Sequence, residues 1–370
     1  MAPPTPMIRD EVSSLPAYNA GMHPEKLRRQ LGLDRIVKLD SNESPFGPSP
    51  TAIAAVTAAA SGFGRYPDRD ESALRGLIAA DLGVDPETLA FGDGSEDLIG
   101  ILYRMVMRPG ECAVTTVPSF GLHQIWAEVL GAHALLLPFE KDWRFPIEAI
   151  ERALTDNPRV LILASPSNPV GAVMTEADVD RVLAACGPDT LLIFDEAYVE
   201  FVSPAARVDV LAKLRRRRAP WVVLRTFSKA YGLAGLRIGY GIAHDAGFVR
   251  DLYKVRAPFS VNAAAQAAAA AAYADGKHLD MVTSAIRKLR GELAAALQKR
   301  GLAVAPSEGN SLFFETGLDS RAVAAGLRER GVLVKPWLEP GYTSFVRVSI
   351  GTRRDNEAFL AALDAVLAAA

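Results

Sequence analysis

The chain has 370 residues, of which 49% are hydrophobic and 23% are charged. These fractions are typical of soluble globular proteins and exclude a disordered chain or a small peptide scaffold, while the length suggests about two domains. With 41 Lys and Arg against 43 Asp and Glu, the formal net charge of −2 gives no overall attraction to nucleic acid or an anionic membrane, so we expect a small-molecule ligand.

The N-terminus and the two cysteines bear on the compartment. The first residues, MAPPTPMIRDE, place prolines and charges where a secretory signal needs an apolar stretch. Cys112 and Cys186 are too few for a disulfide framework and lack the spacing of zinc ligands. The alanine-rich residues 263–274 include Gln266 and Tyr273 and are read as a packed helix, not a bilayer span. We therefore expect a cytoplasmic protein that binds no metal.

From about residue 88 to 245, short β-branched runs alternate with helix-like segments. This pattern predicts an α/β fold, with a mostly parallel sheet sandwiched by helices and parallel strands joined by crossover helices. The runs lack polar alternation, as expected when both faces of a sheet are covered. Residues 176–185 have helical spacing of their apolar side chains, with Thr175 as the N-cap. The predicted strands are residues 112–117, 134–139, 160–164, 191–195, 221–226 and 238–242.

Beyond residue 275 the pattern changes and predicts a smaller α+β unit. Its expected elements are a helix over residues 278–300 that ends at Gly301, a strand at SLFFE, a helix over residues 321–330, and strands near Val332 and Phe345. We therefore expect a large α/β domain over residues 41–274. Residues 1–40, which include an N-terminal arm, and residues 275–370 would form the small domain.

Three polar residues lie at or after the ends of neighbouring predicted strands. Asn168 lies in SPSNPVG, Asp195 ends LLIFD, and Lys229 lies in TFSKAYGLAGLR. Each alone has an ordinary explanation, as a turn residue, a helix N-cap or a surface cation. Because ligands bind beyond the carboxyl ends of parallel strands, their joint occurrence predicts a binding site at that edge of the sheet.

A glycine-rich loop, GDGSED, follows the strand-like LAF and opens an apolar-periodic helix. Its amides can surround an anion at the helix N-terminus, although such loops also simply turn the chain. The segment TFSKAYGLAGLR adds two hydroxyls and an arginine, whose planar fork suits phosphate. The residues that could hold a phosphate are Gly94, Ser95, Glu96, Thr226, Ser228 and Arg237.

The combined set of side chains matches the needs of pyridoxal 5′-phosphate. That cofactor carries an aldehyde that forms an imine with a lysine, a ring nitrogen that needs a carboxylate, and a ring oxygen that needs donors. Lys229, Asp195, Asn168 and Tyr198 supply these groups, and the glycine-rich loop supplies the anion site. Phe120, in PSFG, is placed either to stack on the ring or to pack in the core.

Motifs along nearly the whole chain, from Tyr18 to Glu357, carry a family resemblance. They are NESPFGPSP, RYPD, GDGSED, PSFG, SPSNPVG, FDEAYVEF, TFSKAYGLAGLRIGY and FVRVSIGTRRDNE. In this succession the chain resembles the fold-type I pyridoxal-phosphate aminotransferases, and most closely the histidinol-phosphate aminotransferase family. The resemblance implies a homodimer with shared active sites. It also implies the reaction of L-histidinol phosphate with 2-oxoglutarate to give imidazole acetol phosphate and L-glutamate, a step of histidine biosynthesis.

The same resemblance implies residue roles. Lys229 would bond to the cofactor aldehyde, Asp195 would pair with the ring nitrogen, and Asn168 and Tyr198 would donate to the ring oxygen. Tyr66, in RYPD, would reach the cofactor phosphate of the neighbouring subunit. The substrate would be held by Tyr18, Asn168, Lys335 and Arg347, and the cofactor phosphate by Ser95, Glu96, Thr226, Ser228 and Arg237.

Two departures from the family pattern keep alternatives open. Lys335 stands where many relatives carry a second arginine, so the clamp on the substrate phosphate would include a point charge, and Phe120 replaces a common tyrosine. An aminotransferase for aromatic or other amino acids, or a decarboxylase on the same scaffold, would use the same cofactor site. A nicotinamide-dependent oxidoreductase is a more distant alternative, because GDGSED lacks a third glycine. The basic run 215–218 fits a solvated helix end better than a nucleic-acid site.

Overall fold

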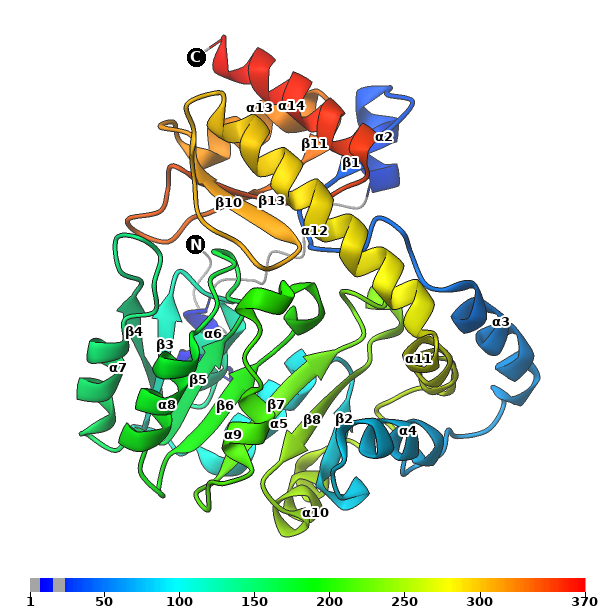
Figure 1. The fold of residues 1–370 in the computed structure, drawn as a ribbon, viewed down its shortest axis with the longest axis vertical. Helices are drawn as coiled ribbons and strands as arrows, with labels where there is room; N and C mark the ends of the chain where they lie inside the picture. The colour runs from blue at the N-terminus through cyan, green and yellow to red at the C-terminus, as the bar shows by residue number, and fades with distance from the viewer. Residues whose placement is uncertain (1–6, 16–23, 370) are drawn as a thin grey trace.

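A computed structural model of the chain describes residues 7–15 and 24–369. Figure 1 shows a large twisted sheet with helices packed on both faces, and a smaller group of strands and helices formed by the C-terminal part of the chain. The long helix α12 (Gly276–Gln298) runs from the large group toward the small one.

The large sheet has seven strands in the order β2-β8-β7-β6-β5-β3-β4. Adjacent strands in the stretch from β7 to β4 are parallel, whereas β8 runs antiparallel to both of its neighbours. The strands are β2 (Leu89–Gly92), β3 (Cys112–Val117), β4 (His133–Pro138), β5 (Val160–Ala164), β6 (Leu191–Asp195), β7 (Trp221–Thr226) and β8 (Gly239–Ala243).

The predicted strands agree with the structure closely, with one correction. Four of them match residue for residue, and β4 and β8 are shifted by one position. The mostly parallel sheet is confirmed, but the rule of parallel strands joined by crossover helices does not hold for β8. Residues 227–238 between β7 and β8 contain only a short turn of 3₁₀ helix, Ala234–Leu236, and no crossover helix, so the chain re-enters the sheet from the same edge in the opposite direction.

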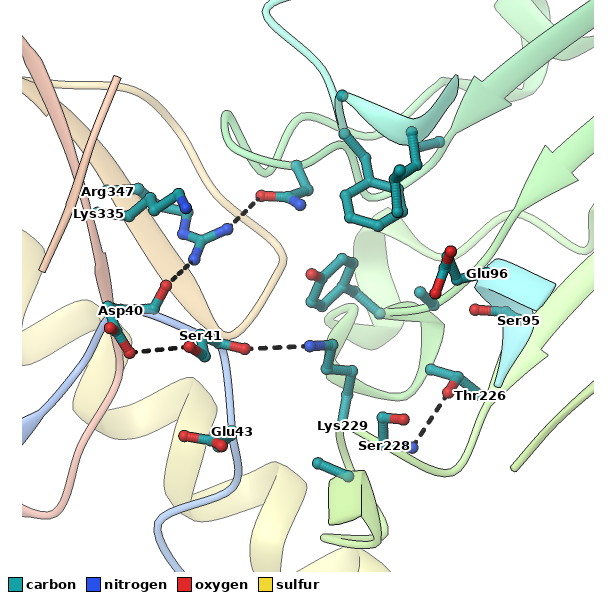
Figure 2. A pocket seen from close by; sticks show the side chains of 18 of the residues that line it. Asp40, Ser41, Glu43, Ser95, Glu96, Thr226, Ser228, Lys229, Lys335 and Arg347 are labelled. Atoms are coloured by element: carbon teal, nitrogen blue, oxygen red, sulfur yellow. Dashed lines mark hydrogen bonds between the residues drawn. The ribbon is translucent and has the colours of Figure 1, made fainter. Parts of the chain in front are cut away.

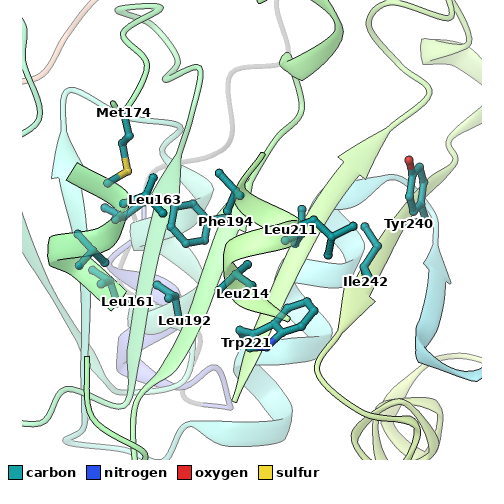
Figure 3. Packing of buried hydrophobic residues seen from close by; sticks show 14 of the residues in the cluster. Leu161, Leu163, Met174, Leu192, Phe194, Leu211, Leu214, Trp221, Tyr240 and Ile242 are labelled. Carbon is teal, nitrogen blue, oxygen red and sulfur yellow. The ribbon is translucent and has the colours of Figure 1, made fainter. Parts of the chain in front are cut away.

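Alternate residues of the central strands pack into two separate hydrophobic cores. In β5, Leu161 and Leu163 face one core, whereas Val160 and Ile162 face the other, as the two-residue period of a strand requires. Figure 3 shows the first core, where Phe194 of the sheet and Leu211 of helix α9 (Val210–Leu214) are both buried. With both faces covered, polar side chains can meet a ligand at the ends of the strands.

Helices cover both faces of the large sheet. Residues of α4, α7, α8, α9 and α11 belong to the first core, and residues of α5, α6 and α10 to the second. The predicted helix at residues 176–185 is confirmed as α8, and Thr175 caps it together with Asp178 in a reciprocal capping box. The helices up to α11 are α1 (Asp10–Ser13), α2 (Pro24–Leu31), α3 (Pro50–Ala59), α4 (Ser72–Leu82), α5 (Ser95–Val106), α6 (Leu122–Val129), α7 (Ile147–Leu154), α8 (Glu176–Ala185), α9 (Val210–Leu214), α10 (Ala246–Val255) and α11 (Ala263–Ala274).

The smaller group of elements has a core of its own around an antiparallel sheet. Its strand order is β12-β13-β10-β9, from β9 (Ala303–Val304), β10 (Ser311–Glu315), β12 (Lys335–Pro336) and β13 (Phe345–Ser349). The helices α12, α13 (Ser320–Glu329) and α14 (Arg353–Leu367) contribute apolar residues to that core. The helices and strands expected after residue 275 are therefore confirmed within one or two residues at their ends.

The N-terminal segment joins this smaller group through a strand pair. β1 (Val37–Lys38) lies parallel to β11 (Val332–Leu333), nearly 300 positions later in the chain. This pairing agrees with grouping residues 1–40 with residues 275–370, although the division into two domains at those positions stays a prediction.

Two smaller findings concern the surface of the described chain. Two arginines of the basic run 215–218 cap backbone carbonyls: Arg215 donates to Leu82, and Arg217 donates to Leu183 and Gly187. These contacts give two of its cations a structural partner within the protein. Within residues 7–15 and 24–369, no helix has both the length and the apolar character that crossing a bilayer requires.

Candidate active site

A cavity of about 1050 Å³ lies beyond the carboxyl ends of β5, β6 and β7. Figure 2 shows Lys229 in its middle, with Ser95, Glu96, Thr226 and Ser228 on one side and Asp40, Lys335 and Arg347 on the other. The predicted site residues that line it are Ser95, Glu96, Phe120, Asn168, Asp195, Tyr198, Thr226, Ser228, Lys229, Arg237, Lys335 and Arg347.

One end of the cavity is built for an anion by the start of α5. Its N-cap is Gly94, whose φ of 87° and ψ of 166° are accessible essentially to glycine, and no side chain caps the first turn. The backbone amides of Ser95 and Glu96 are therefore available to an oxyanion. A Cβ on Gly94 would lie 2.5 Å from Arg237 Nη2, so the glycine also permits the close approach of this guanidinium.

The guanidinium of Arg237 is fixed at this anion site by an unusual backbone. Arg237 has a φ of 57°, in the left-handed region that non-glycine residues rarely adopt. Its side chain donates to Asp93 O at 3.1 Å and to Ser228 Oγ at 3.4 Å. The Ser228 amide donates to Thr226 Oγ1 at 3.1 Å, which holds the two hydroxyl residues together. A cation, two hydroxyls and a helix N-terminus thus surround one end of the cavity.

The amine of Lys229 lies between the two ends of the cavity, and its pKa is lowered. Its Nζ donates to the backbone carbonyl of Ser41 at 3.2 Å and lies 5.8 Å from the centre of the Tyr198 ring. Burial and the positive charge of Arg347 lower the pKa of this amine from 10.5 to about 8. About a tenth of Lys229 is therefore neutral and nucleophilic at pH 7, roughly 300 times the fraction that the ordinary pKa of 10.5 would give.

Asp195 is held by a histidine that the sequence reasoning did not single out. The Asp195 carboxylate is 6% exposed, and its Oδ1 accepts the Ala197 amide at 3.1 Å. His123 on α6 is fully buried, with Nε2 3.2 Å from Asp195 Oδ2 and Nδ1 3.3 Å from Ser119 Oγ. The available signal was the histidine three residues after Phe120 in PSFGLH, which places it one helical turn from that ring.

Tyr198 is positioned by Asn42, a second residue that sequence reasoning missed. Asn42 Nδ2 donates to the Tyr198 hydroxyl at 3.1 Å, while Ser349 Oγ donates to Asn42 Oδ1 at 2.9 Å. Asn42 is 1% exposed. It therefore ties the N-terminal segment, the tyrosine and strand β13 together, and the signal for it was its place in the NESPFG motif.

The opposite end of the cavity carries two cations on neighbouring strands. Lys335 on β12 and Arg347 on β13 are direct partners in the antiparallel pair, so they lie side by side. Arg347 Nη1 donates to Asn168 Oδ1 at 2.8 Å, and Nη2 donates to the backbone carbonyl of Asp40. Burial and the charge of Arg347 lower the pKa of Lys335 below its usual value. This end suits a second anion.

The remaining predicted residues have other placements. Phe120 lines the cavity, and its ring meets His123 edge to face with centroids 5.6 Å apart. Tyr66 does not line the cavity of its own chain; it is 82% exposed and stacks on Phe259 at a centroid distance of 4.7 Å. Tyr18 lies outside the described residues.

These residues fit the cofactor that the sequence predicts. An amine with a lowered pKa, a buried carboxylate, a tyrosine hydroxyl and an uncapped helix N-terminus beside an arginine correspond to the aldehyde, ring nitrogen, ring oxygen and phosphate of pyridoxal phosphate. The second cationic end leaves room for an anionic substrate next to the same amine. The arrangement is therefore suited to chemistry on an amine that carries an anionic group.

Comparisons with known proteins agree with this geometry. Residues 34–363 match the family described as aminotransferase class I and II. Among curated proteins, the chain is 42% identical to histidinol-phosphate aminotransferase 1 of Mesorhizobium japonicum, over 99% of this chain and 100% of that protein. It is 39% identical to histidinol-phosphate aminotransferase 3 of Rhizobium meliloti, over 99% of each.

Solved structures give the same result. A crystal structure of histidinol-phosphate aminotransferase from Sinorhizobium meliloti in complex with pyridoxal-5′-phosphate has a TM-score of 0.90 and 30% identity, and the match covers 99% of each chain. A single mutant of aspartate aminotransferase from Thermus thermophilus has a TM-score of 0.84 at 22% identity, over 97% of this chain and 99% of that chain, which is a likeness of fold alone.

Proposed function

Because the chain belongs to the class I and II aminotransferases, we propose that it transfers the amino group of L-histidinol phosphate to 2-oxoglutarate, with pyridoxal phosphate as its cofactor. The products are imidazole acetol phosphate and L-glutamate, which places the reaction in histidine biosynthesis. The observation that carries this proposal is the pair of anion-binding ends on either side of the Lys229 amine, in a chain similar over its full length to relatives of that name.

The cofactor end would be held by residues at the ends of β6 and β7, in the first turn of α5 and in the loops beside them. Asp195 at the end of β6 would pair with the ring nitrogen, and the Tyr198 hydroxyl and the Asn168 amide would donate to the ring oxygen. Phe120 would cover one ring face. The phosphate would be held by the first turn of α5 and by the side chains of Ser95, Thr226, Ser228 and Arg237.

Lys229 would act as the proton carrier of the reaction. When bound, pyridoxal phosphate supplies an aldehyde that bonds to amines and a ring that takes up the electron pair left when a substrate carbon loses its proton. The Lys229 amine, with its pKa lowered to about 8, can accept that proton at neutral pH and later return it. Asp195 supports the positive charge of the ring nitrogen, because a buried carboxylate beside a cation favours the charged form.

The substrate end must accept two different anions in turn. Arg347 offers a planar fork that suits both the phosphate of the donor and a carboxylate of 2-oxoglutarate. Lys335 beside it adds a second charge. A site shared by donor and acceptor implies that one leaves before the other binds, so we expect ping-pong kinetics.

We further propose a cytoplasmic homodimer with shared sites. Tyr66 is exposed and away from its own cavity, so a role at the cofactor phosphate requires a second subunit. Phe259, on which the Tyr66 ring stacks, is also exposed, so the two rings form an apolar pair that a partner would cover. We also propose the division into a large domain, residues 41–274, and a small domain from residues 1–40 and 275–370.

A panel of amino donors with purified holoenzyme tests the proposed substrate. Histidinol phosphate should give the highest kcat/KM, with glutamate formed from 2-oxoglutarate. The replacement of a second arginine by Lys335 favours a rival, an aminotransferase for aromatic amino acids, as the second candidate. A preference for phenylalanine over histidinol phosphate would support that rival, and release of carbon dioxide without glutamate would indicate a decarboxylase.

A further inference from the structure

We propose that Lys38 determines specificity at the phosphate end of the substrate. Its ammonium would bind the phosphate monoester of the amino donor together with Arg347 and Lys335, giving up its contact with Glu43. The smaller, singly charged carboxylate of glutamate or 2-oxoglutarate would leave the Lys38–Glu43 pair in place. The inference rests on the proposed function, because it concerns the donor that this same site accepts.

Lys38 lines the cavity and is linked through Asp40 to its substrate end. It ends β1 and lines the same cavity as Lys335 and Arg347. Asp40 connects these groups, because its carboxylate lies 2.9 Å from Lys38 Nζ and its backbone carbonyl accepts a hydrogen bond from Arg347. Figure 2 shows Asp40 and Glu43 on the same side of Lys229 as Lys335 and Arg347, away from Ser95 and Thr226.

The two carboxylates that hold Lys38 are not equivalent. Asp40 is 7% exposed and also accepts a hydrogen bond from the Ser41 hydroxyl at 2.8 Å, so its position is fixed. Glu43 lies 2.6 Å from Lys38 Nζ, but its side chain is 47% exposed. An ion pair with a solvated partner contributes little net stability, so Glu43 is the partner that an arriving anion can replace.

The charges at this end favour a group more highly charged than a carboxylate. Burial would lower the pKa of Lys38, but hydrogen bonds with Glu43 and Asp40 raise it overall, so the amine stays protonated. Three cations, Lys38, Lys335 and Arg347, then face two carboxylates. A carboxylate substrate is satisfied by the Arg347 fork alone, whereas a phosphate monoester carries about −1.5 to −2 charges and three acceptor oxygens. A third cation at this end would therefore favour the phosphate monoester over the carboxylate.

The ping-pong reaction provides an internal control for the test. Each half-reaction of the holoenzyme is followed separately by its absorbance change, one with histidinol phosphate and one with glutamate. Lys38→Met, which keeps the aliphatic stem, should raise the KM for histidinol phosphate roughly 10-fold, the effect of losing one charge-assisted hydrogen bond. The KM for glutamate should stay within about two-fold. Lys299→Met, at an exposed position, serves as the matched control and should change neither.

Two further variants separate substrate binding from a structural role. Lys38→Arg keeps the cation and should recover most of the affinity for the donor. Glu43→Gln removes the competing carboxylate while Lys38 remains, so the KM for histidinol phosphate should not rise. The proposal would be overturned if Lys38→Met left the KM for histidinol phosphate unchanged or raised the KM for histidinol phosphate and for glutamate equally. A higher KM for histidinol phosphate in Glu43→Gln would also overturn it.

Inhibition by inorganic phosphate tests the role of Lys38 independently of the proposed amino donor. If the wild-type enzyme does not use histidinol phosphate, the proposed donor is wrong, and Lys38 is then tested with phosphate as an inhibitor of the glutamate half-reaction. Weaker inhibition of Lys38→Met than of the wild type supports the role of Lys38, and equal inhibition of both refutes it.

Discussion

Arg347 Nη1 donates a hydrogen bond to Asn168 Oδ1 at 2.8 Å, which joins the substrate end of the cavity to the cofactor end. Asn168 follows β5 of the large sheet, and Arg347 lies on β13 of the small one. The amide can accept from the arginine with its oxygen while its nitrogen donates toward the cofactor. If Asn168 binds the ring oxygen as proposed, binding of an anion at Arg347 would be coupled to that oxygen through one side chain.

Replacing Asn168 should affect both ends of the site together. In Asn168→Ala, Arg347 loses a buried partner and the ring oxygen loses a donor, so the KM for the amino donor and the dissociation constant for the cofactor should both rise, each by roughly 5- to 100-fold. Steady-state kinetics and cofactor titration measure the two values. A rise in only one of them would show that the two ends act independently.

The lowered pKa of Lys229 predicts the pH dependence of its reactivity. The neutral amine is the reactive form, so reductive trapping of pyridoxal phosphate on the apoprotein should increase with pH through a midpoint of about 8, well below the ordinary 10.5. Arg347→Gln removes a positive charge that disfavours the protonated amine, so the midpoint should move to higher pH. Mass spectrometry of the trapped adduct at Lys229 reports both; a midpoint near 10.5 in the wild type would contradict the electrostatics.

His123 is expected to be a positioning residue that acts through Asp195. His123→Phe keeps the buried volume approximately but leaves Asp195 Oδ2 without its ring partner, so cofactor affinity should fall roughly 5- to 100-fold. His123→Asn restores a donor and should lose less. His133→Phe, at an exposed position on β4, is the matched control. A loss of thermal stability with unchanged cofactor affinity would mean that His123 serves only the core.

Gly94 should tolerate no side chain. Gly94→Ala would cost about 1–3 kcal/mol in backbone strain and would place a methyl group 2.5 Å from Arg237 Nη2. We therefore expect weaker cofactor binding, measured by titration, together with a lower thermal midpoint. Gly76→Ala, exposed in the interior of α4 with open space around it, should instead be neutral or stabilising. If Gly94→Ala and Gly76→Ala had the same cofactor affinity and thermal midpoint, the close approach of Arg237 to Gly94 would be refuted.

Complementation tests the shared site. Lys229→Ala and Tyr66→Ala should each be nearly inactive alone, the first because it lacks the reactive amine and the second because the partner's phosphate loses a contact. When the two variants are unfolded and refolded together, half of the dimers are mixed and each contains one intact site, so activity should return to about a quarter of the wild-type value. No recovery would place Tyr66 outside the neighbouring site.

The sequence by itself determined the local elements and the side chains that carry the chemistry. Four strands, the helix at residues 176–185 and its Thr175 cap were predicted to the residue, because buried apolar runs and capping hydroxyls are local signals. Asn168, Asp195 and Lys229 were placed together because parallel strands end at one edge. The direction of β8 was not predictable in this way, because a buried strand has the same apolar sequence pattern whether it runs parallel or antiparallel to its neighbours.

The tertiary structure alone decided which distant residues hold these groups. His123 reaches Asp195 across 72 positions, Asn42 reaches Tyr198 across 156, and Asp40 reaches Arg347 across 307. Such partners leave no periodic trace in a sequence, because a hydrogen bond depends on where two elements pack and not on their spacing along the chain. For the same reason the lowered pKa of Lys229 follows from the burial and the neighbouring charges that folding creates.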